Sequence, residues 1–265
     1  MLRAALASPA RLNRFPVKSR ISVHPRERDM QRLAAKLALA ATAISLIAGA
    51  ASAQTVKSIS HEGLDPASGK APKQAVLMFH GYTQRGVDMK VVADDLAKRL
   101  PDAVFIFDNA PNVARSGFSW YDMQGENAAS KAAAKDLATG LVKTAETTWK
   151  LKPDHIVAVG FSQGGGVALD AAICSKPNLK AVVSLAGVLE SSCDKVSTDQ
   201  ATNILIVRND GDPLVKEERI VAFEDAVKKA GYMSKRETVT GATHWPAEDG
   251  VKKAEDFIVA QLGGK

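Results

Sequence analysis

The segment that most constrains this chain is the hexapeptide Gly160-Phe161-Ser162-Gln163-Gly164-Gly165. It follows an apolar run over 155–159 and precedes a helix-like run over 167–172. A serine between glycines, with a strand before it and a helix after it, is typical of a sharp turn that presents the hydroxyl as a nucleophile. Glycine is needed on both sides because the strand and the helix pass close together. The pattern therefore predicts a nucleophilic Ser162, the alternative being a chance match in a chain rich in alanine and glycine.

Strand-like and helix-like segments alternate along the chain. Short continuous apolar runs, together with one later β-prone run, predict strands at 75–79, 103–107, 155–159, 180–187, 203–207 and 234–240. Apolar residues at helical spacing predict helices at 87–100, 126–150, 167–172, 215–230 and 247–262. This alternation implies right-handed crossovers and a mainly parallel central sheet with helices on both faces. Because the connections are mostly short, we expect a single α/β domain over 54–265 without a sizeable cap domain.

The positive charge of the chain is concentrated at its N-terminal end. The formal net charge is +6, but residues 1–53 contain nine Lys or Arg and two Asp or Glu, which leaves residues 54–265 with −1. No basic stripe of the kind that nucleic-acid-binding proteins present remains in that part. We therefore expect no nucleic-acid partner.

Residues 30–53 have the layout of a secretory signal peptide. A short basic region precedes an uncharged stretch over 37–53, which ends in the cleavage-site pattern Ala51-Ser52-Ala53. A membrane anchor is the alternative, but the stretch is short and diluted with Ala, Ser, Thr and Gly. We expect cleavage before Gln54, a periplasmic or secreted protein and no stable membrane anchor. Residues 1–29 are then an upstream or disordered extension, with an Arg-rich transit peptide as the alternative.

The chain contains two cysteines, Cys174 and Cys193. In an exported protein they are allowed to pair, and the short loop that they would close would stabilise the fold by roughly 3 kcal/mol. Two buried thiols are the alternative, because the sequence does not fix the distance between the two Cα atoms.

Reactive residues follow the predicted strands at their carboxyl ends, where open α/β sheets bind ligands. A serine hydroxyl needs an adjacent base, usually a histidine that a carboxylate holds in the correct tautomer. The chain supplies Ser162, then an aspartate after the fifth strand and His244 after the last, the order typical of α/β-hydrolases. We prefer Asp212 as the acid, with Asp210 as the alternative. His244 is preferred to the other histidines because it lies downstream of both partners.

Two backbone N–H groups are candidates for stabilising the oxyanion of a tetrahedral intermediate. One belongs to Gln163, directly after the serine and at a helix N-terminus. The other is expected in the loop after the first long strand, from Tyr82, with Thr83 in reserve.

Three aromatic residues, Trp120, Tyr121 and Trp245, are expected to line a substrate pocket. Packing in the core is the alternative for each of them, because large aromatic side chains commonly dominate protein cores.

Four motifs together resemble the phospholipase/carboxylesterase family of α/β-hydrolases, which includes the acyl-protein thioesterases. They are the hexapeptide 160–165, His80-Gly81-Tyr82, Asp212-Pro213-Leu214-Val215 and Gly241-Ala242-Thr243-His244. Two further segments, Asn109-Ala110-Pro111 and Ser119-Trp120-Tyr121-Asp122, are similar to that family's loops near the acyl site. By this resemblance, which covers 76–262, Ser162 is the nucleophile, Asp212 the acid and His244 the base. Tyr82 and Gln163 are the oxyanion donors.

One segment departs from the family pattern. Relatives commonly have His-Gly ahead of the acid loop, whereas this chain has Arg208-Asn209. The departure leaves the choice between Asp210 and Asp212 open. Dienelactone hydrolases have a similar layout but a cysteine at the turn, and Ser162 argues against that group.

The sequence therefore predicts an exported serine carboxylesterase that hydrolyses small-molecule esters or thioesters of short or medium acyl groups, through an acyl-enzyme and without a metal or cofactor. A polymer or aryl-ester hydrolase, of the depolymerase or feruloyl-esterase kind, is the second interpretation. A non-catalytic binding protein on a hydrolase fold is the third, because fold alone does not imply function. The sequence does not indicate an oligomeric state.

Overall fold

The computed structural model describes residues 61–124, 127–173, 179–188 and 202–264. The chain divides into two units, Met1–Ala53 and Gln54–Lys265, and all described residues belong to the second. The predicted extension at 1–29, the predicted signal peptide at 30–53 and both cysteines lie outside the described residues. Within the described part of the chain, no helix combines the length and the apolar character that a membrane crossing requires.

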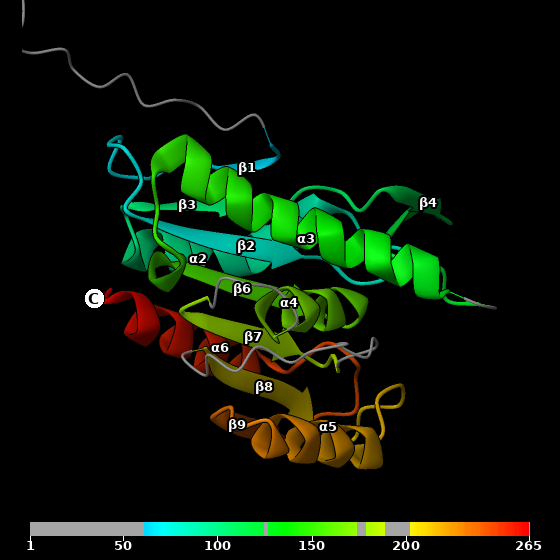
Figure 1. The fold of residues 1–265 in the computed structure, drawn as a ribbon. Coiled ribbons are helices and arrows are strands. Elements are labelled where there is room, and N and C mark those ends of the chain that lie inside the picture. Colours follow the sequence, from blue (N-terminus) through cyan, green and yellow to red (C-terminus); the bar gives the residue numbers. More distant parts are fainter. Residues whose placement is uncertain (1–60, 125–126, 174–178, 189–201, 265) are drawn as a thin grey trace, which may run out of the picture. The chain divides into compact units, whose positions relative to one another are not determined.

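A seven-stranded sheet with the order β1-β3-β2-β6-β7-β8-β9 forms the centre of the described residues (Figure 1). All neighbouring strands pair in parallel except β1, which runs antiparallel to β3. The strands are β1 Gly63–Leu64, β2 Gln74–Phe79, β3 Ala103–Ile106, β6 Ile156–Phe161, β7 Ala181–Leu185, β8 Asn203–Asn209 and β9 Ser234–Val239. The mainly parallel sheet that the sequence predicted is therefore confirmed.

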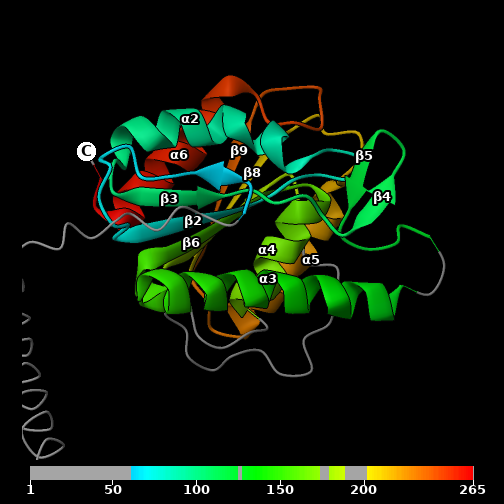
Figure 2. The same ribbon diagram turned by 90° about the horizontal axis from the view of Figure 1, so that it is seen from above.

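Helices cover both faces of the sheet, with α2 and α6 on one face and α3, α4 and α5 on the other (Figure 2). The helices are α2 Lys90–Arg99, α3 Ala128–Trp149, α4 Gln163–Ile173, α5 Glu217–Lys229 and α6 Glu248–Leu262, with short 3-10 turns η1 Gly86–Met89 and η2 Pro153–His155. Together with the sheet they form a single α/β-hydrolase domain, and the described residues contain no separate cap.

Strand β2 shows how the sequence pattern builds the two layers. Ala75, Leu77 and Phe79 pack with residues of α3, α4 and α5, whereas Val76 and Met78 pack with residues of α2 and α6. Successive side chains of a strand point to opposite faces, so a strand covered on both faces must be apolar throughout. Burial on both faces therefore explains why the strands appear in the sequence as continuous apolar runs.

Besides shifts of a few residues at element ends, three segments differ from the predicted elements. Strand β1 lies in a polar segment predicted to be irregular, and it consists of two residues that pair with β3. The loop after β3 contains a hairpin of β4 Asn112–Ala114 and β5 Gly117–Ser119. Strand β8 continues two residues beyond the predicted 203–207, through Arg208 and Asn209. These segments are short or contain polar residues, so they do not form the apolar runs from which strands were predicted.

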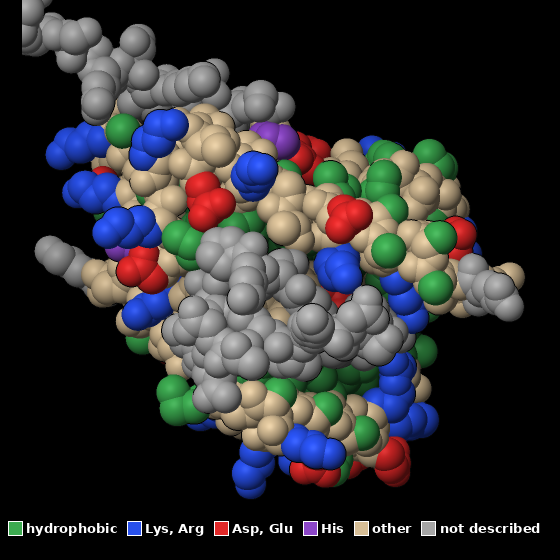
Figure 3. All heavy atoms as spheres, in the orientation of Figure 1, with side chains coloured by type: hydrophobic (Ala, Val, Ile, Leu, Met, Phe, Trp, Pro, Cys, Tyr) green, Lys and Arg blue, Asp and Glu red, His purple; other side chains and the backbone are tan. Residues whose placement is uncertain are grey.

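Acidic and basic side chains are interspersed over α3 and α5 on the face that Figure 3 shows. Some of them form ion pairs, as Arg236 of β9 does with Glu224 of α5, 3.1 Å apart. Partly exposed pairs of this kind contribute little to the free energy of unfolding, typically less than about 1 kcal/mol.

Candidate active site

Ser162 occupies a strained turn between β6 and α4. Its φ angle is +52°, in the left-handed region that residues other than glycine rarely adopt. Its N–H donates to the carbonyl of Leu185 in β7, 2.8 Å away. A Cβ atom at Gly160 would lie 2.1 Å from the carbonyl oxygen of Gly164, and a Cβ at Gly164 would lie 2.1 Å from that of Phe79. The glycines are therefore required because backbone passes backbone at this turn.

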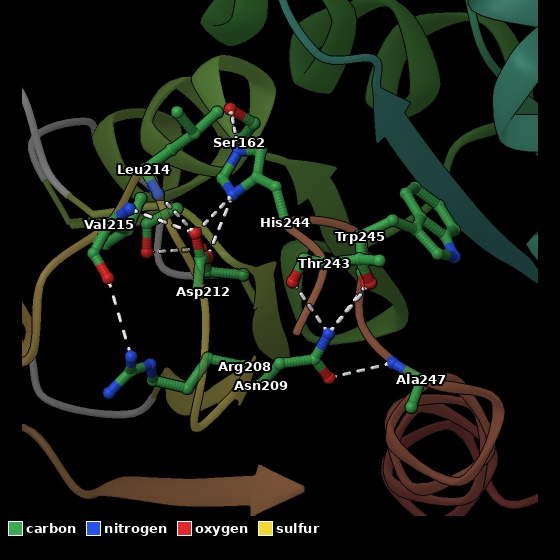
Figure 4. A network of polar contacts seen from close by, with 12 residues as sticks. Ser162, Arg208, Asn209, Asp212, Leu214, Val215, Thr243, His244, Trp245 and Ala247 are labelled. Carbon is green, nitrogen blue, oxygen red and sulfur yellow. Dashed lines mark hydrogen bonds and ion pairs between the residues drawn. The ribbon is translucent and has the colours of Figure 1, made fainter. Parts of the chain in front are cut away.

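The structure brings Ser162, His244 and Asp212 together in a hydrogen-bonded chain (Figure 4). His244 Nε2 lies 2.7 Å from Ser162 Oγ, and His244 Nδ1 lies 2.8 Å from Asp212 Oδ2. A carboxylate only accepts hydrogen bonds, so the imidazole proton lies on Nδ1 and Nε2 is left to accept from the serine hydroxyl. This arrangement allows the histidine to remove the serine proton when the hydroxyl attacks an acyl carbon.

Asp212 is buried on the Nδ1 side of His244 and is held there by hydrogen bonds. Its side chain is 0% exposed, against 15% for His244. Its Oδ1 also accepts hydrogen bonds from the backbone N–H groups of Leu214 at 2.8 Å and Val215 at 3.1 Å. These contacts hold the carboxylate in the position from which it orients the imidazole.

Asp210, the alternative acid, is exposed and makes a different contact. Its Oδ1 accepts the N–H of Gly241 at 3.0 Å, at the start of the loop that carries His244. The structure therefore places Asp212 and not Asp210 against the imidazole, although both residues follow β8.

The two predicted oxyanion donors are backbone N–H groups in the loop after β2 and at the start of α4. Gln163 is the first residue of α4, where a backbone N–H has no partner inside the helix. Among the described residues, neither the Gln163 N–H nor the Tyr82 N–H has a hydrogen-bond acceptor. The N–H of Thr83, the reserve candidate, donates to the carbonyl of Phe118 at 2.8 Å. Tyr82 and Gln163 therefore retain the free donors.

His80 supports the loop that carries Tyr82. Its Nε2 accepts the N–H of Ala110 at 2.9 Å, so its proton lies on Nδ1, which is 2.7 Å from the carbonyl of Gly81. Burial lowers the pKa of His80, and its hydrogen bonds suit the neutral ring. His80 therefore has a structural role.

The three aromatic residues predicted to line the pocket lie in different surroundings. Trp120 is 1% exposed, packs against Phe79 and donates from its indole N–H to the carbonyl of His80 at 2.8 Å. Tyr121 is also buried. These positions correspond to the alternative of core packing, because a ring without exposed surface offers none to a substrate.

Trp245 follows His244 but its ring points away from Ser162 (Figure 4). It packs edge-on against Phe161, with ring centroids 4.6 Å apart. It also lines a cavity of about 720 Å³ formed with residues of α2 and α6, and neither Ser162 nor Asp212 is part of that lining. Its contacts are thus on the face of the sheet covered by α2 and α6.

The side chain of Gln163 has contacts that the sequence analysis missed. Its Oε1 accepts the N–H of Trp120 at 2.9 Å, and its Nε2 donates to the carbonyl of Tyr121 at 2.8 Å and to Ser119 Oγ at 3.0 Å. The first residue of α4 thereby fixes the loop after β5. A polar residue following the serine was the only available signal, and it was interpreted through its backbone alone.

The fold, together with the hydrogen bonds that link Ser162, His244 and Asp212, defines a protein of the α/β-hydrolase class. Residues 66–262 match the model of the phospholipase/carboxylesterase family, and the chain belongs to that family. Membership confirms the family that the sequence motifs indicated and the predicted enzyme class, a serine hydrolase acting on carboxylic ester bonds.

Individual relatives are distant. The chain is 24% identical over 211 residues to acyl-protein thioesterase 1 of Neurospora crassa, spanning 71% of this chain and 86% of that protein. It is 26% identical over 169 residues to esterase YpfH of Escherichia coli, spanning 61% and 72%. The crystal structure of esterase PE8 superposes with a TM-score of 0.66 at 23% identity, over 78% of this chain and 100% of the other. The Bacillus cereus carboxylesterase gives a TM-score of 0.66 at 14% identity, over 76% and 93%. At such identities the superpositions show the fold alone.

The described residues contain no group of three or more His, Cys, Asp or Glu side chains arranged to hold a metal ion.

Proposed function

We propose that this protein is an exported serine carboxylesterase, with Ser162 as nucleophile, His244 as general base and Asp212 as the orienting acid. Its substrates are esters or thioesters of short or medium acyl groups. The observation that carries the proposal is the continuous hydrogen-bonded chain from Ser162 Oγ through His244 to Asp212, with contacts of 2.7 and 2.8 Å.

In the acylation step, Ser162 Oγ attacks the acyl carbon while His244 Nε2 takes the hydroxyl proton. The tetrahedral intermediate then collapses, and the alcohol or thiol leaves with the proton that His244 returns. Water enters and loses its proton to His244, so the same steps release the carboxylic acid and restore the serine. Asp212 stabilises the imidazolium that forms in each half of the cycle.

The backbone N–H groups of Tyr82 and Gln163 would donate to the oxyanion of this intermediate. Gln163 lies at the N-terminus of α4, where the helix dipole also favours negative charge. Removal of a single oxyanion donor typically costs about 10²- to 10³-fold in rate.

Exposed apolar side chains on the surrounding loops support an acyl substrate. Leu214 lies in the acid loop, and Met123 lies beside Gln163, with its sulfur 3.4 Å from Gln163 Nε2. Further apolar surface lies around β4, where Val113 is exposed (Figure 3). Thioesters are included because some matched relatives are named acyl-protein thioesterase 1.

A panel of p-nitrophenyl esters from acetate to octanoate, with matching thiocholine esters, tests this function. Ser162→Ala is expected to lower kcat by about 10³-fold or more on every substrate that the wild type hydrolyses. Ser234→Ala is the control. Ser234 is the first residue of β9, at the strand end away from the His244 loop, so kcat should be unchanged. An inactive wild type, or a Ser162→Ala variant within tenfold of wild type, would refute the proposal.

Export is the part of the proposal that rests on the sequence of residues 30–53. Expression of the full chain in a Gram-negative host, followed by N-terminal sequencing of the periplasmic protein, should give a mature start at Gln54. A protein that stays in the cytoplasm with residues before Met30 still attached would contradict it.

A further inference from the structure

The pair Arg208-Asn209 stands at the end of β8, in the place where relatives commonly have His-Gly. Asn209 is a polar residue that is 0% exposed. A buried amide without hydrogen-bond partners would destabilise the fold, so its contacts show what it is there to hold.

Within the described residues, the hydrogen bonds of the Asn209 side chain all go to residues 243–247 around His244 (Figure 4). Its Nδ2 donates to the backbone carbonyls of Thr243 at 2.8 Å and Trp245 at 2.9 Å, and lies 3.2 Å from Thr243 Oγ1. Its Oδ1 accepts the N–H of Ala247 at 2.9 Å. The two carbonyls belong to the residues directly before and after His244.

The loop is shaped to receive this amide. A Cβ atom at Gly241 would lie 2.6 Å from Asn209 Cγ, so only a glycine leaves room for the Asn209 side chain at that turn. A glycine at position 209 would instead leave the carbonyls of Thr243 and Trp245 and the N–H of Ala247 without their present partner. The asparagine and the loop are therefore complementary in shape and in hydrogen bonding.

We propose that Asn209 is a positioning residue for His244. By fixing the backbone on both sides of the histidine, it sets the placement of Nε2 opposite Ser162 Oγ. The Asn209 side chain forms no hydrogen bond with Ser162 or Asp212, so it acts through the histidine loop. This inference rests on the proposed function, in which His244 is the general base.

Asn209→Ala and the isosteric Asn209→Asp test the proposal. The aspartate keeps an acceptor for the Ala247 N–H but presents a carboxylate to two carbonyls. Both variants are expected to lower kcat for p-nitrophenyl butyrate by about 10- to 100-fold with KM changed less than threefold, because misplacement of a catalytic group by about 1 Å has effects of this size. Asn203→Ala is the matched control, since Asn203 lies at the other end of β8 and bonds to Gln261 of α6. It should leave kcat unchanged.

The same substitution in a His244→Ala background separates positioning from general weakening of the fold. If Asn209 acts through His244, Asn209→Ala should alter the residual rate of the His244→Ala enzyme less than twofold. An equal loss in both backgrounds would overturn the proposal, and so would a folded Asn209→Ala enzyme with kcat within twofold of wild type. Failure of both Asn209 variants to fold would also overturn it by making the residue structural. A wild type without esterase activity would instead refute the proposed function.

Discussion

The serine side and the acid–base side of the site are held in place by different means. Ser162 is fixed by the backbone, through the positive φ angle, the hydrogen bond to Leu185 and the glycines that let β6 and α4 pass closely. Asp212 and His244 lie in loops after β8 and β9, and side chains hold these loops. The nucleophile is thus held by backbone geometry, whereas the loops of its partners also depend on polar side-chain contacts from the end of β8.

The end of β8 supports both loops at once. Asn209 binds the His244 loop, while Arg208, whose side chain is almost fully buried, pairs with Glu217 and lies 3.5 Å from the carbonyl of Val215. Val215 in turn donates its N–H to Asp212. Adjacent residues of a strand point to opposite faces, which is how one strand end reaches two loops.

The largest effect on kcat is expected at Asp212, and it should distinguish this residue from Asp210 in the same loop. Asp212→Asn is expected to lower kcat by about 10³- to 10⁴-fold, because an amide no longer holds the imidazole in the required tautomer. Asp210→Asn should change kcat less than threefold, since the amide oxygen can still accept the Gly241 N–H. Steady-state kinetics with p-nitrophenyl butyrate measure both. A larger loss at Asp210 would reverse the assignment of the acid.

The backbone side of the comparison is tested by Gly164→Ala. The added Cβ would lie 2.1 Å from the Phe79 carbonyl oxygen, so the free energy of unfolding should fall by about 3 kcal/mol. Gly140→Ala is the control, because a Cβ at that position in α3 meets nothing within 4 Å and alanine favours a helix by up to about 1 kcal/mol. Urea unfolding gives both values. Similar stabilities for the two variants would show that the serine turn tolerates bulk.

Helix α6 starts just after the His244 loop and contains Glu255, a buried carboxyl that makes the free energy of unfolding depend on pH. Burial, with a contribution from Asp95, raises the pKa of Glu255 to about 7, while Arg99 opposes the shift. Glu255 is 8% exposed. Because its folded pKa exceeds its ordinary value of 4.5, the stability it contributes is present below about pH 4.5 and is lost as the pH rises toward 7.

Glu255→Gln should therefore unfold like wild type near pH 4.5 and be more stable than wild type at pH 8, by about 1 to 2 kcal/mol after allowance for solvent screening. Urea titrations at the two pH values measure the difference. A stability difference that does not change with pH would show that the Glu255 carboxyl is not the titrating group.

The smallest effect is expected for Arg208→Met. Loss of the guanidinium frees the Val215 carbonyl, yet Glu217 is half exposed and retains Arg236 as a partner, so no charge is left buried alone. We expect kcat to fall about two- to tenfold, less than for Asn209→Ala, with a stability loss of about 1 kcal/mol. Arg236→Met is the control and should leave kcat unchanged. A greater loss of kcat for Arg208→Met than for Asn209→Ala would show that the Asp212 loop depends more on its side-chain support than the His244 loop does.

The same contrast explains what the sequence could predict. The serine turn is indicated by glycines within a few residues of Ser162, and the parallel sheet by apolar runs, so both were predictable. The sequence favoured Asp212 over Asp210 without excluding Asp210, because both follow β8 and only the folded loop places one of them against His244.

Longer-range contacts were out of reach for a related reason. The partners of Asn209 lie more than 30 residues further along the chain, and those of the Gln163 side chain at least 40 residues earlier. Trp120 was expected in the pocket because its loop resembles one near the family's acyl site, yet the loop folds its indole inward onto His80. Such contacts depend on how loops close over the sheet.

The central claim is that Ser162 is the nucleophile and depends on a histidine held by its loop. The most direct measurement is covalent labelling by a fluorophosphonate, with the modified residue located by mass spectrometry and the labelling rate compared with that of His244→Ala. We expect a single adduct on Ser162 and a labelling rate at least about 10³-fold lower in the variant. An adduct on another residue, or equal rates in the two proteins, would contradict it.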